Sequence, residues 1–389
     1  MKKSRLTEAL FLVPGIWLIA ATATAIPTPI PVCAPSLEQY YCPHTDEAPI
    51  IDGNLDEAAW SRAPWSADFV DIEGDLKPPP TWRTNQKMLW DDTHLYIAAR
   101  LEEPHVWATL TQRDAVIYHD NDFEVFIDPD GDNHLYYELE INALGTEWDL
   151  LLVRPYRDGA PAVNAWDIQG LKTAVMVDGT LNDPSDRDQG WTVEIAIPWE
   201  VLAQCAGRPV PPTDGDIWRM NFSRVQWQTQ VQDWQYVKII DPETGRPLPE
   251  NNWVWSPQGL IAMHYPERWG EVMFIGSKLG TGNRPTLFDT SPEHQSILTG
   301  NHLMPLYYAQ KSWFEEHGFY AGSLTELGFG KGDASACPLP TGDAEGSEGW
   351  LLEMEGGGER FLGRLITPHG IMTIDEQGCL VRDPLKGKP

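Results

Sequence analysis

Basic side chains are scarce in this chain of 389 residues, because 28 Lys and Arg stand against 57 Asp and Glu and give a formal net charge of −29. Such a negative chain repels nucleic-acid phosphates and anionic lipid headgroups. Long apolar runs are missing too, since the run from Leu10 to Ala21 is short for a membrane span and contains Pro14 and Gly15. The sequence therefore predicts neither nucleic-acid binding nor membrane insertion.

Cysteine is also scarce, and no two of the cysteines have the spacing of a zinc finger. All five of them follow residue 25, and the odd number leaves at least one thiol outside any intramolecular disulfide. The sequence is compatible with a bond between Cys337 and Cys379 but does not decide the pairing. Residues 1–25 have a basic start, an apolar run and the small residues Ala23-Thr24-Ala25, which is typical of a secretory signal. We therefore expect an exported protein, extracellular or periplasmic.

Signatures of catalysis are missing as well. The chain has no GxSxG and no HExxH motif, and Gly330-Lys331-Gly332 lacks the rest of a phosphate-binding loop. A glycoside hydrolase needs two carboxylates at a defined separation across a cleft. Acids are abundant here, but the sequence singles out no such pair. We therefore expect no enzymatic activity, and a glycoside hydrolase remains the weaker alternative.

Apolar and polar residues alternate instead along much of the chain, which is typical of β-strands. The central stretch, 120–150, contains two such runs, 123–128 and 137–142, joined by the turn sequence Asp128-Pro-Asp-Gly-Asp-Asn133. This pattern predicts an antiparallel hairpin with one packed and one wet face. Further alternating runs are 84–90, 94–101, 171–177, 190–197, 217–227 and 271–275. Periodicity of a helix is almost absent before residue 300, although Asp56 can cap a short helix from Glu57. The predicted fold class is an all-β, antiparallel β-sandwich.

The composition changes after residue 277. Gly, Pro and Thr are frequent in 276–290, which indicates a linker, and 302–317 has the apolar spacing of a helix. Three short strands are predicted at 351–355, 360–366 and 371–374. We therefore divide the chain into a signal peptide (1–25), a Pro-rich lead-in (26–45), the sandwich (46–277), a linker (278–300) and a small α+β segment (301–389).

Acids and aromatic rings gather on the polar side of the central hairpin. Asp122 or Glu124 on one strand and Glu138 and Glu140 on the other lie on this side, with Tyr118 and Trp148 close in sequence. Carboxylates accept hydrogen bonds from sugar hydroxyls, and aromatic rings stack on the apolar face of a sugar. A solvated strand face would give the same pattern.

The turn at 128–133 presents three acids at alternate positions, Asp128, Asp130 and Asp132. An EF-hand would need Gly at its sixth position and Glu at its twelfth, where this chain has Asn133 and Leu139. The turn is therefore no EF-hand. It is either a plain turn or a site for structural calcium that is completed by other residues.

Six separated blocks of the sequence resemble, in order, a family 9 carbohydrate-binding module: IDGNLDEAAW (51–60), MLWDDTHLYIAARL (88–101), DFEVFIDPDGDNHLYYELEINALGTEWDL (122–150), GWTVEIAIPW (190–199), WRMNFSRVQ (218–226) and WSPQGLIAMHYPERWGEVMF (255–274). The chain looks like the long, divergent branch of that family, often found as stand-alone exported proteins. The resemblance implies an Ig-like sandwich that grips glycan ends between two Trp rings. It also implies bound structural calcium, and a glycoside hydrolase or a cell-surface component as partner.

The resemblance also suggests site residues. Glu124 falls on the sugar-facing acid of the family, Tyr118 on one clamp ring and Glu140 on a sugar-binding Arg. The second ring falls at about Met263 or His264. We therefore expect Tyr118, Glu124, Glu140 and His264 at the site, with Arg224 as their cationic partner.

These residues predict weak binding of a poly- or oligosaccharide, because a single ring contributes only about 1 kcal/mol beyond area burial. A β-linked plant-type glycan or its end, bound in support of polysaccharide breakdown, is the ligand we expect. The alternative is a structural or adhesive surface protein, because 306–327 faintly resembles the helix and loop of pilin-like proteins.

Overall fold

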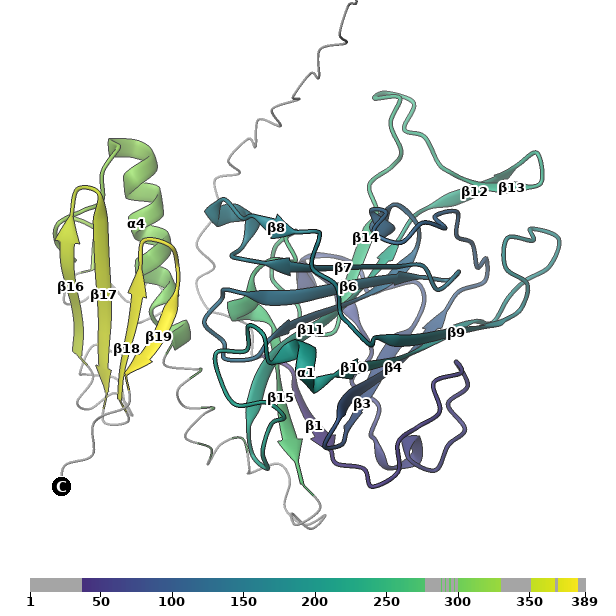
Figure 1. The fold of residues 1–389 in the computed structure, drawn as a ribbon. Helices are drawn as coiled ribbons and strands as arrows, with labels where there is room; N and C mark the ends of the chain where they lie inside the picture. Colours follow the sequence, from purple (N-terminus) through teal and green to yellow (C-terminus); the bar gives the residue numbers. More distant parts are fainter. Residues whose placement is uncertain are drawn as a thin grey trace, which may run out of the picture. The chain divides into compact units, whose positions relative to one another are not determined.

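The structure, a computed structural model, describes residues 37–276, 288, 291, 294, 297, 300–329, 351–367 and 370–383. The expected signal peptide, most of the linker and Cys337 lie outside these residues. None of the helices in the described part of the chain is long and apolar enough to cross a membrane. Strands make up most of the described secondary structure, as the alternating patterns predict (Figure 1).

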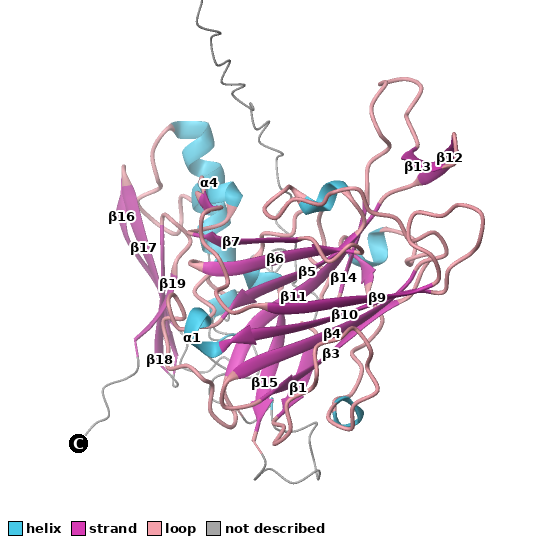
Figure 2. Ribbon diagram, turned by 45° about the vertical axis from the view of Figure 1, so that its right-hand side comes forward, coloured by secondary structure: helices cyan, strands magenta, loops and turns pink. Residues whose placement is uncertain are grey.

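Two sheets form the sandwich (Figure 2). The larger sheet contains β1 (Gln39–Pro43), β15 (Gly270–Ile275), β11 (Ile217–Gln226), β5 (Asp122–Asp128), β6 (Tyr136–Asn142), β7 (Glu147–Leu152) and β8 (Ala162–Val163) in that order, with β14 (Asn251–Val254) beside β11 and β2 (Val70–Asp71) beside β14. The smaller sheet has the order β3 (Thr84–Trp90), β4 (His94–Glu102), β10 (Gly190–Pro198) and β9 (Lys172–Asp178). Strand pairs in these two sheets are antiparallel except β1 with β15, which is parallel. The predicted antiparallel β-sandwich is confirmed.

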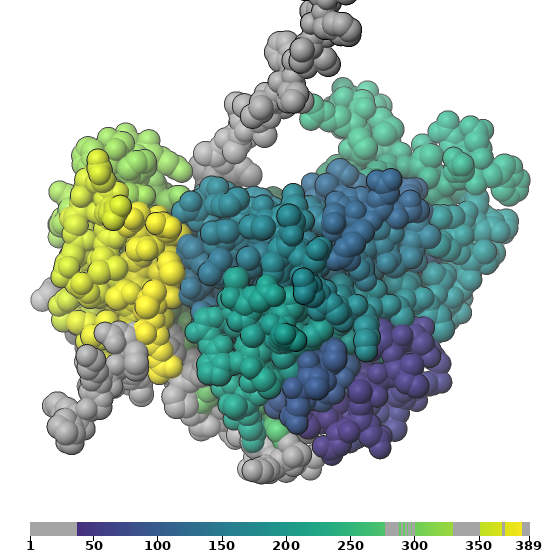
Figure 3. All heavy atoms as spheres, in the orientation of Figure 1, coloured from purple at the N-terminus to yellow at the C-terminus, as the bar shows by residue number. Residues whose placement is uncertain are grey.

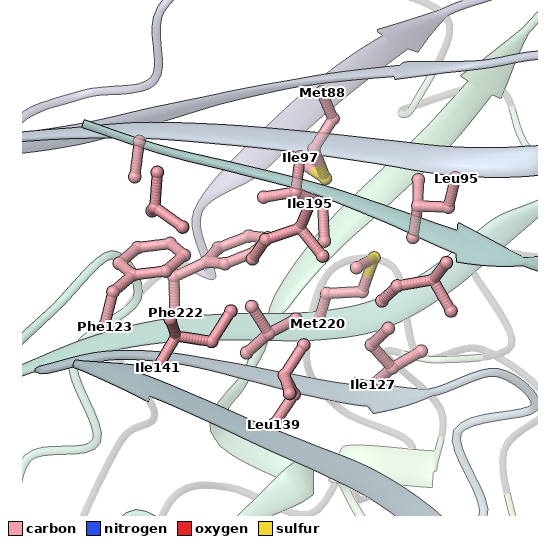
Figure 4. Packing of buried hydrophobic residues seen from close by; sticks show 14 of the residues in the cluster. Met88, Leu95, Ile97, Phe123, Ile127, Leu139, Ile141, Ile195, Met220 and Phe222 are labelled. Atoms are coloured by element: carbon pink, nitrogen blue, oxygen red, sulfur yellow. The ribbon is translucent and has the colours of Figure 1, made fainter. Parts of the chain in front are cut away.

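The main core lies between the two sheets. Phe123 and Ile127 of β5 point into it, and Ile97 of β4 and Ile195 of β10 meet them from the smaller sheet (Figure 4). Each fully buried side chain of this size stabilises the fold by about 1.5–3 kcal/mol. Because the odd-numbered residues of β5 face this core, its even-numbered residues lie on the opposite face of the sheet.

That other face is buried too, so the expectation of a wet face on the central hairpin is wrong. All residues of β5 and β6 are buried. Phe126 and Tyr136 pack there with Trp148 of β7 and with Trp269, from the segment that precedes β15. The local alternation of the strands cannot show that distant segments cover their polar side.

The segment before β2 differs from the expected helix. Only a 3-10 turn forms, Trp60–Arg62, and no side chain caps it. Glu194, buried on β10, accepts hydrogen bonds from the backbone N–H groups of Asp52 (2.9 Å) and Gly53 (2.7 Å) and from the Trp60 indole N–H (2.6 Å). These long-range bonds, rather than the cap that Asp56 would provide, hold the segment in place.

A hairpin of β12 (Thr229–Gln232) and β13 (Gln235–Lys238) projects from the sandwich (Figure 3). Asp233 and Trp234 form its tip with positive φ angles of 50° and 60°. At its base Tyr236 packs against Trp107 and Trp227. The base therefore connects the hairpin with the loops at one end of the larger sheet.

The C-terminal segment has the predicted helix and strands. Helix α4 (Met304–His317) ends at Gly318, whose φ of 77° permits the left-handed conformation. The strands β16 (Leu351–Gly357), β17 (Arg360–Thr367), β18 (Gly370–Asp375) and β19 (Leu380–Asp383) form a separate antiparallel sheet. One strand, β19, is added to the three that the sequence predicts. A short helix, α1 (Trp199–Leu202), follows β10.

Candidate functional site

The register of the larger sheet sets a row of side chains across its outer face. Glu124 lies opposite Glu140, Ser223 follows on β11, and Trp148 follows on β7. Directly paired residues in antiparallel strands point to the same face. Trp148, Glu140, Glu124 and Ser223 therefore form one continuous row, and Glu138 stands beside it in the next row.

The acids in this region are closely packed and buried. Glu124 is 6% exposed, Glu138 5%, Glu140 1% and Asp122 0%. None of the ion pairs found among the described residues involves any of these four acids. Burial, followed by the neighbouring carboxylates, raises the pKa of Asp122 and of Glu140 well above the usual range. Burial also raises the pKa of Glu124 to about 7, against a hydrogen bond from Ser223 that lowers it.

Tyr118 lies at the edge of these acids. It belongs to the 3-10 turn Ile117–His119 that leads into β5, and its backbone N–H donates to Glu140 Oε2 at 2.9 Å. Its carbonyl accepts the Trp227 indole N–H at 2.8 Å, so the hairpin base helps to fix this turn. The ring is 37% exposed and lies 6.3 Å from the Trp148 ring. Tyr118 therefore presents an aromatic surface next to buried acceptors.

A second exposed ring comes from Tyr156, in the 3-10 turn Tyr156–Asp158 after β7. Its side chain is 49% exposed, and its ring lies 4.5 Å from that of His264 at an interplanar angle of 86°. Burial of its hydroxyl raises the Tyr156 pKa to about 12, and the charges of Glu138 and Glu140 contribute to the rise. Two tyrosines from different loops thus border the same acids.

His264 supports this second ring. Its Nδ1 is hydrogen-bonded to the Tyr136 hydroxyl at 2.9 Å, and its carbonyl accepts a hydrogen bond from Arg157 at 2.9 Å. Burial lowers the pKa of His264 to about 3, and the nearby positive charge of Arg157 acts in the same direction. The imidazole is therefore neutral at physiological pH and can serve as donor or acceptor through its other nitrogen.

Arg224 lies elsewhere. It is 1% exposed and bonds to Glu103 Oε2 at 3.0 Å and to Thr84 Oγ1 at 2.9 Å, toward the smaller sheet. Along β11 it alternates with Ser223, which belongs to the row on the outer face. The structure thus brings Tyr118, Glu124, Glu140 and His264 together but places Arg224 on the opposite side of the sheet.

Tyr156 is the residue that sequence reasoning missed. It stands in a loop where no alternation or spacing marks it, next to Pro155 and Arg157. Only the fold brings it to His264, which is 108 positions further along the chain. The second ring at this surface is therefore a Tyr from the loop after β7.

The turn after β5 draws its three acids together. Single carboxylate oxygens of Asp128, Asp130 and Asp132 lie within 4.8 Å of one another, a spacing that could hold a metal ion. Asp128 also accepts hydrogen bonds from the N–H groups of Gly131 (3.0 Å) and Asn133 (3.1 Å), as in an ordinary turn. Burial raises the pKa of Asp132 to about 7, and the charge of Asp130 adds to this.

Comparison with known proteins gives a family match over 51–272, to the model described as Carbohydrate family 9 binding domain-like. Two enzymes match over 159 residues: endo-1,4-beta-xylanase A of Thermoanaerobacterium saccharolyticum at 27% identity and exoglucanase XynX of Acetivibrio thermocellus at 26%. Each match covers 41% of this chain and only 12% of the enzyme.

Solved structures give weaker similarity. A family 9 module from Caldicellulosiruptor kristjanssonii in complex with cellotriose has a TM-score of 0.40 at 16% identity, covering 63% of this chain and 100% of the module. A putative carbohydrate-binding protein from Bacteroides uniformis has a TM-score of 0.44 at 17% identity, covering 61% of this chain and 100% of that protein.

Proposed function

Because the chain belongs to the carbohydrate family 9 binding domain-like family, we propose that it binds a poly- or oligosaccharide at the surface between Tyr118 and Tyr156. The observation that carries this proposal is the pair of exposed rings beside the buried acceptors Glu138 and Glu140. A ring can stack on the C–H face of a sugar while a carboxylate at its edge accepts hydroxyl hydrogen bonds. We propose no catalytic role, since the family is one of binding modules.

The two enzymes that match part of this chain guide the choice of glycan. They are named as an endo-1,4-beta-xylanase and an exoglucanase. We therefore propose a β-1,4-linked glycan, or its end, as the ligand. We further propose that the protein is exported and acts beside glycoside hydrolases in polysaccharide breakdown.

Calorimetry with cello- and xylo-oligosaccharides tests the binding proposal. We expect dissociation constants between high micromolar and millimolar, and Tyr118→Ala or Tyr156→Ala should each weaken binding about tenfold, since a stacked ring contributes about 1 kcal/mol beyond area burial. Tyr156→Phe keeps the ring and should retain most of the affinity. Phe319→Ala removes an aromatic side chain that is 48% exposed on the C-terminal segment and serves as the control.

Two other outcomes of the calorimetry would contradict the proposed site or the proposed function. Equal titrations for the wild type and both Ala variants would place the glycan elsewhere on the sandwich. No heat from any glycan would refute the proposal and favour the structural or adhesive role.

We also propose a structural calcium ion at Asp128, Asp130 and Asp132. The support is the convergence of their oxygens, because calcium takes carboxylate ligands at 2.3–2.6 Å. A chelator should then lower the melting temperature of the wild type, since an ion that binds only the native state adds stability. The variant Asp130→Asn should respond less, and identical responses would leave the segment as a plain turn.

A further inference from the structure

Two of the buried acids beneath the tyrosines have an oxygen with no hydrogen-bond partner. These atoms are Oδ2 of Asp122 and Oε2 of Glu138. The other oxygen of Asp122, Oδ1, accepts the Val225 N–H at 3.1 Å. A buried carboxylate oxygen without a partner is destabilising by about 1–3 kcal/mol or more, because it has lost its water. Such an atom is therefore available to a ligand.

The neighbouring oxygens show which ligand fits. Asp122, Glu124 and Glu140 each offer one carboxylate oxygen, and these atoms lie within 4.8 Å of one another. Oxygens bound to one calcium ion at about 2.3–2.6 Å are separated by at most about 5 Å. The three oxygens can therefore surround a single cation with little movement.

The charge of the region favours the same ligand. Four acids that are at least 94% buried face one outer surface of β5 and β6, and no Lys or Arg pairs with them in the described part of the chain. Ionised carboxylates in such a site repel one another and are poorly solvated. Protons could neutralise them one by one, but a divalent cation neutralises two at once and also supplies the missing partner.

We propose that Asp122, Glu124 and Glu140 bind a divalent cation of the calcium class beneath the Tyr118–Tyr156 surface. Oxygen ligands alone favour calcium over softer transition metals. Glu138 stays outside this set. The cation site stands on its own geometry, whereas its effect on the glycan rests on the function proposed above.

Terbium luminescence provides the first test. The experiment uses the full mature chain, freed of metal by a chelator, with Asp130→Asn and Asp132→Asn to remove the turn as a competing site. Trp148, paired with Glu140 across the strands, should sensitise terbium emission, and added calcium should quench that emission. Trp148→Phe should reduce the emission at least severalfold while leaving the calorimetric calcium titration in place.

Substitution of the ligands distinguishes this site from others. Glu124→Gln with Glu140→Gln should abolish both the calcium heat and the terbium emission, with the circular dichroism spectrum unchanged. Asp167→Asn is the matched control, because it alters a third group of acids, in which Arg113 already pairs with Asp149 and Asp167. Absence of calcium binding at pH 7.5, or binding that survives the double Gln variant, would overturn the proposal. Binding should weaken in acid, since protons compete for the ligands.

Glycan titrations in calcium and in chelator separate the two proposals. A loss of glycan affinity of tenfold or more in chelator, within the same Asp130→Asn, Asp132→Asn variant, supports the coupling. Equal affinity in both buffers overturns the coupling but leaves the glycan site. Calcium binding without any glycan binding refutes the proposed function and leaves the cation site standing.

Discussion

His264 should make the protein sensitive to mild acid. Its ordinary pKa is 6.5, and burial lowers it to about 3 in the fold. Between these two pH values the imidazole is protonated in the unfolded chain but neutral in the folded chain. A depressed pKa of this kind gives stability that is present above the unfolded value and is lost as the pH falls toward the folded value. From pH 7.5 to pH 5 the loss should be about 2 kcal/mol, because each pH unit below 6.5 contributes about 1.36 kcal/mol.

The comparison that isolates this residue is His264→Asn, whose amide can replace Nδ1 in the bond with the Tyr136 hydroxyl but does not titrate. Urea unfolding of both proteins at pH 7.5 and pH 5 measures the free energy of unfolding. The wild type should lose about 2 kcal/mol more than the variant between the two pH values. Other acids and histidines contribute equally to both proteins and cancel. An equal loss in both would show that the imidazole takes up a proton as readily in the fold as in the unfolded chain, and would refute the description of His264 as a neutral support.

Two further substitutions test the framework around the site. Gly53→Ala should lower the free energy of unfolding by about 2 kcal/mol more than Gly159→Ala. Both glycines have φ near +90°, but a Cβ at Gly53 would lie 2.8 Å from the backbone of β9, whereas nothing lies within 4 Å of a Cβ at Gly159. Equal melting curves would contradict the close approach. Arg224→Leu should lower the free energy of unfolding by about 3–5 kcal/mol, because it leaves Glu103 buried without its charged partner. Adding Glu103→Leu should restore much of that stability in urea unfolding. No recovery in the double variant would mean that the pair is stabilising in itself.

The strands could be predicted because their signal is local. The hairpin of β5 and β6 repeats apolar residues at every second position and has a turn rich in Asp and Gly between the two strands. Both strands begin one residue before the predicted runs and end with them. The helix near residue 57 was less predictable, because Glu194, more than 130 positions away, bonds to that segment and decides its conformation. Local chemistry determines an element only where no distant partner competes.

The residues of the candidate site also divide into those set by local sequence and those set by distant partners. Glu124 and Glu140 could be paired from the hairpin alone, since a turn fixes the register of the strands on both sides of it. Arg224 alternates with Ser223 and lies on the same face of β11 as Phe222, which is in the core. A charged residue is nevertheless expected at the surface unless its buried partner is known. That partner, Glu103, is 121 positions away. Tyr156 lies at the site because of the course of the loop after β7, and no periodicity in the sequence predicts that course.

The parallel pairing of β1 with β15 has a mechanical consequence. These strands are the first and last of the sandwich and run side by side over Gln39–Pro43 and Glu271–Ile275. In parallel strands, a force that pulls the chain at Gln39 and at Ile275 slides one strand along the other. Their hydrogen bonds are then loaded together rather than opened one after another. A sandwich joined at both ends to other parts of a longer assembly would therefore resist tension along this edge.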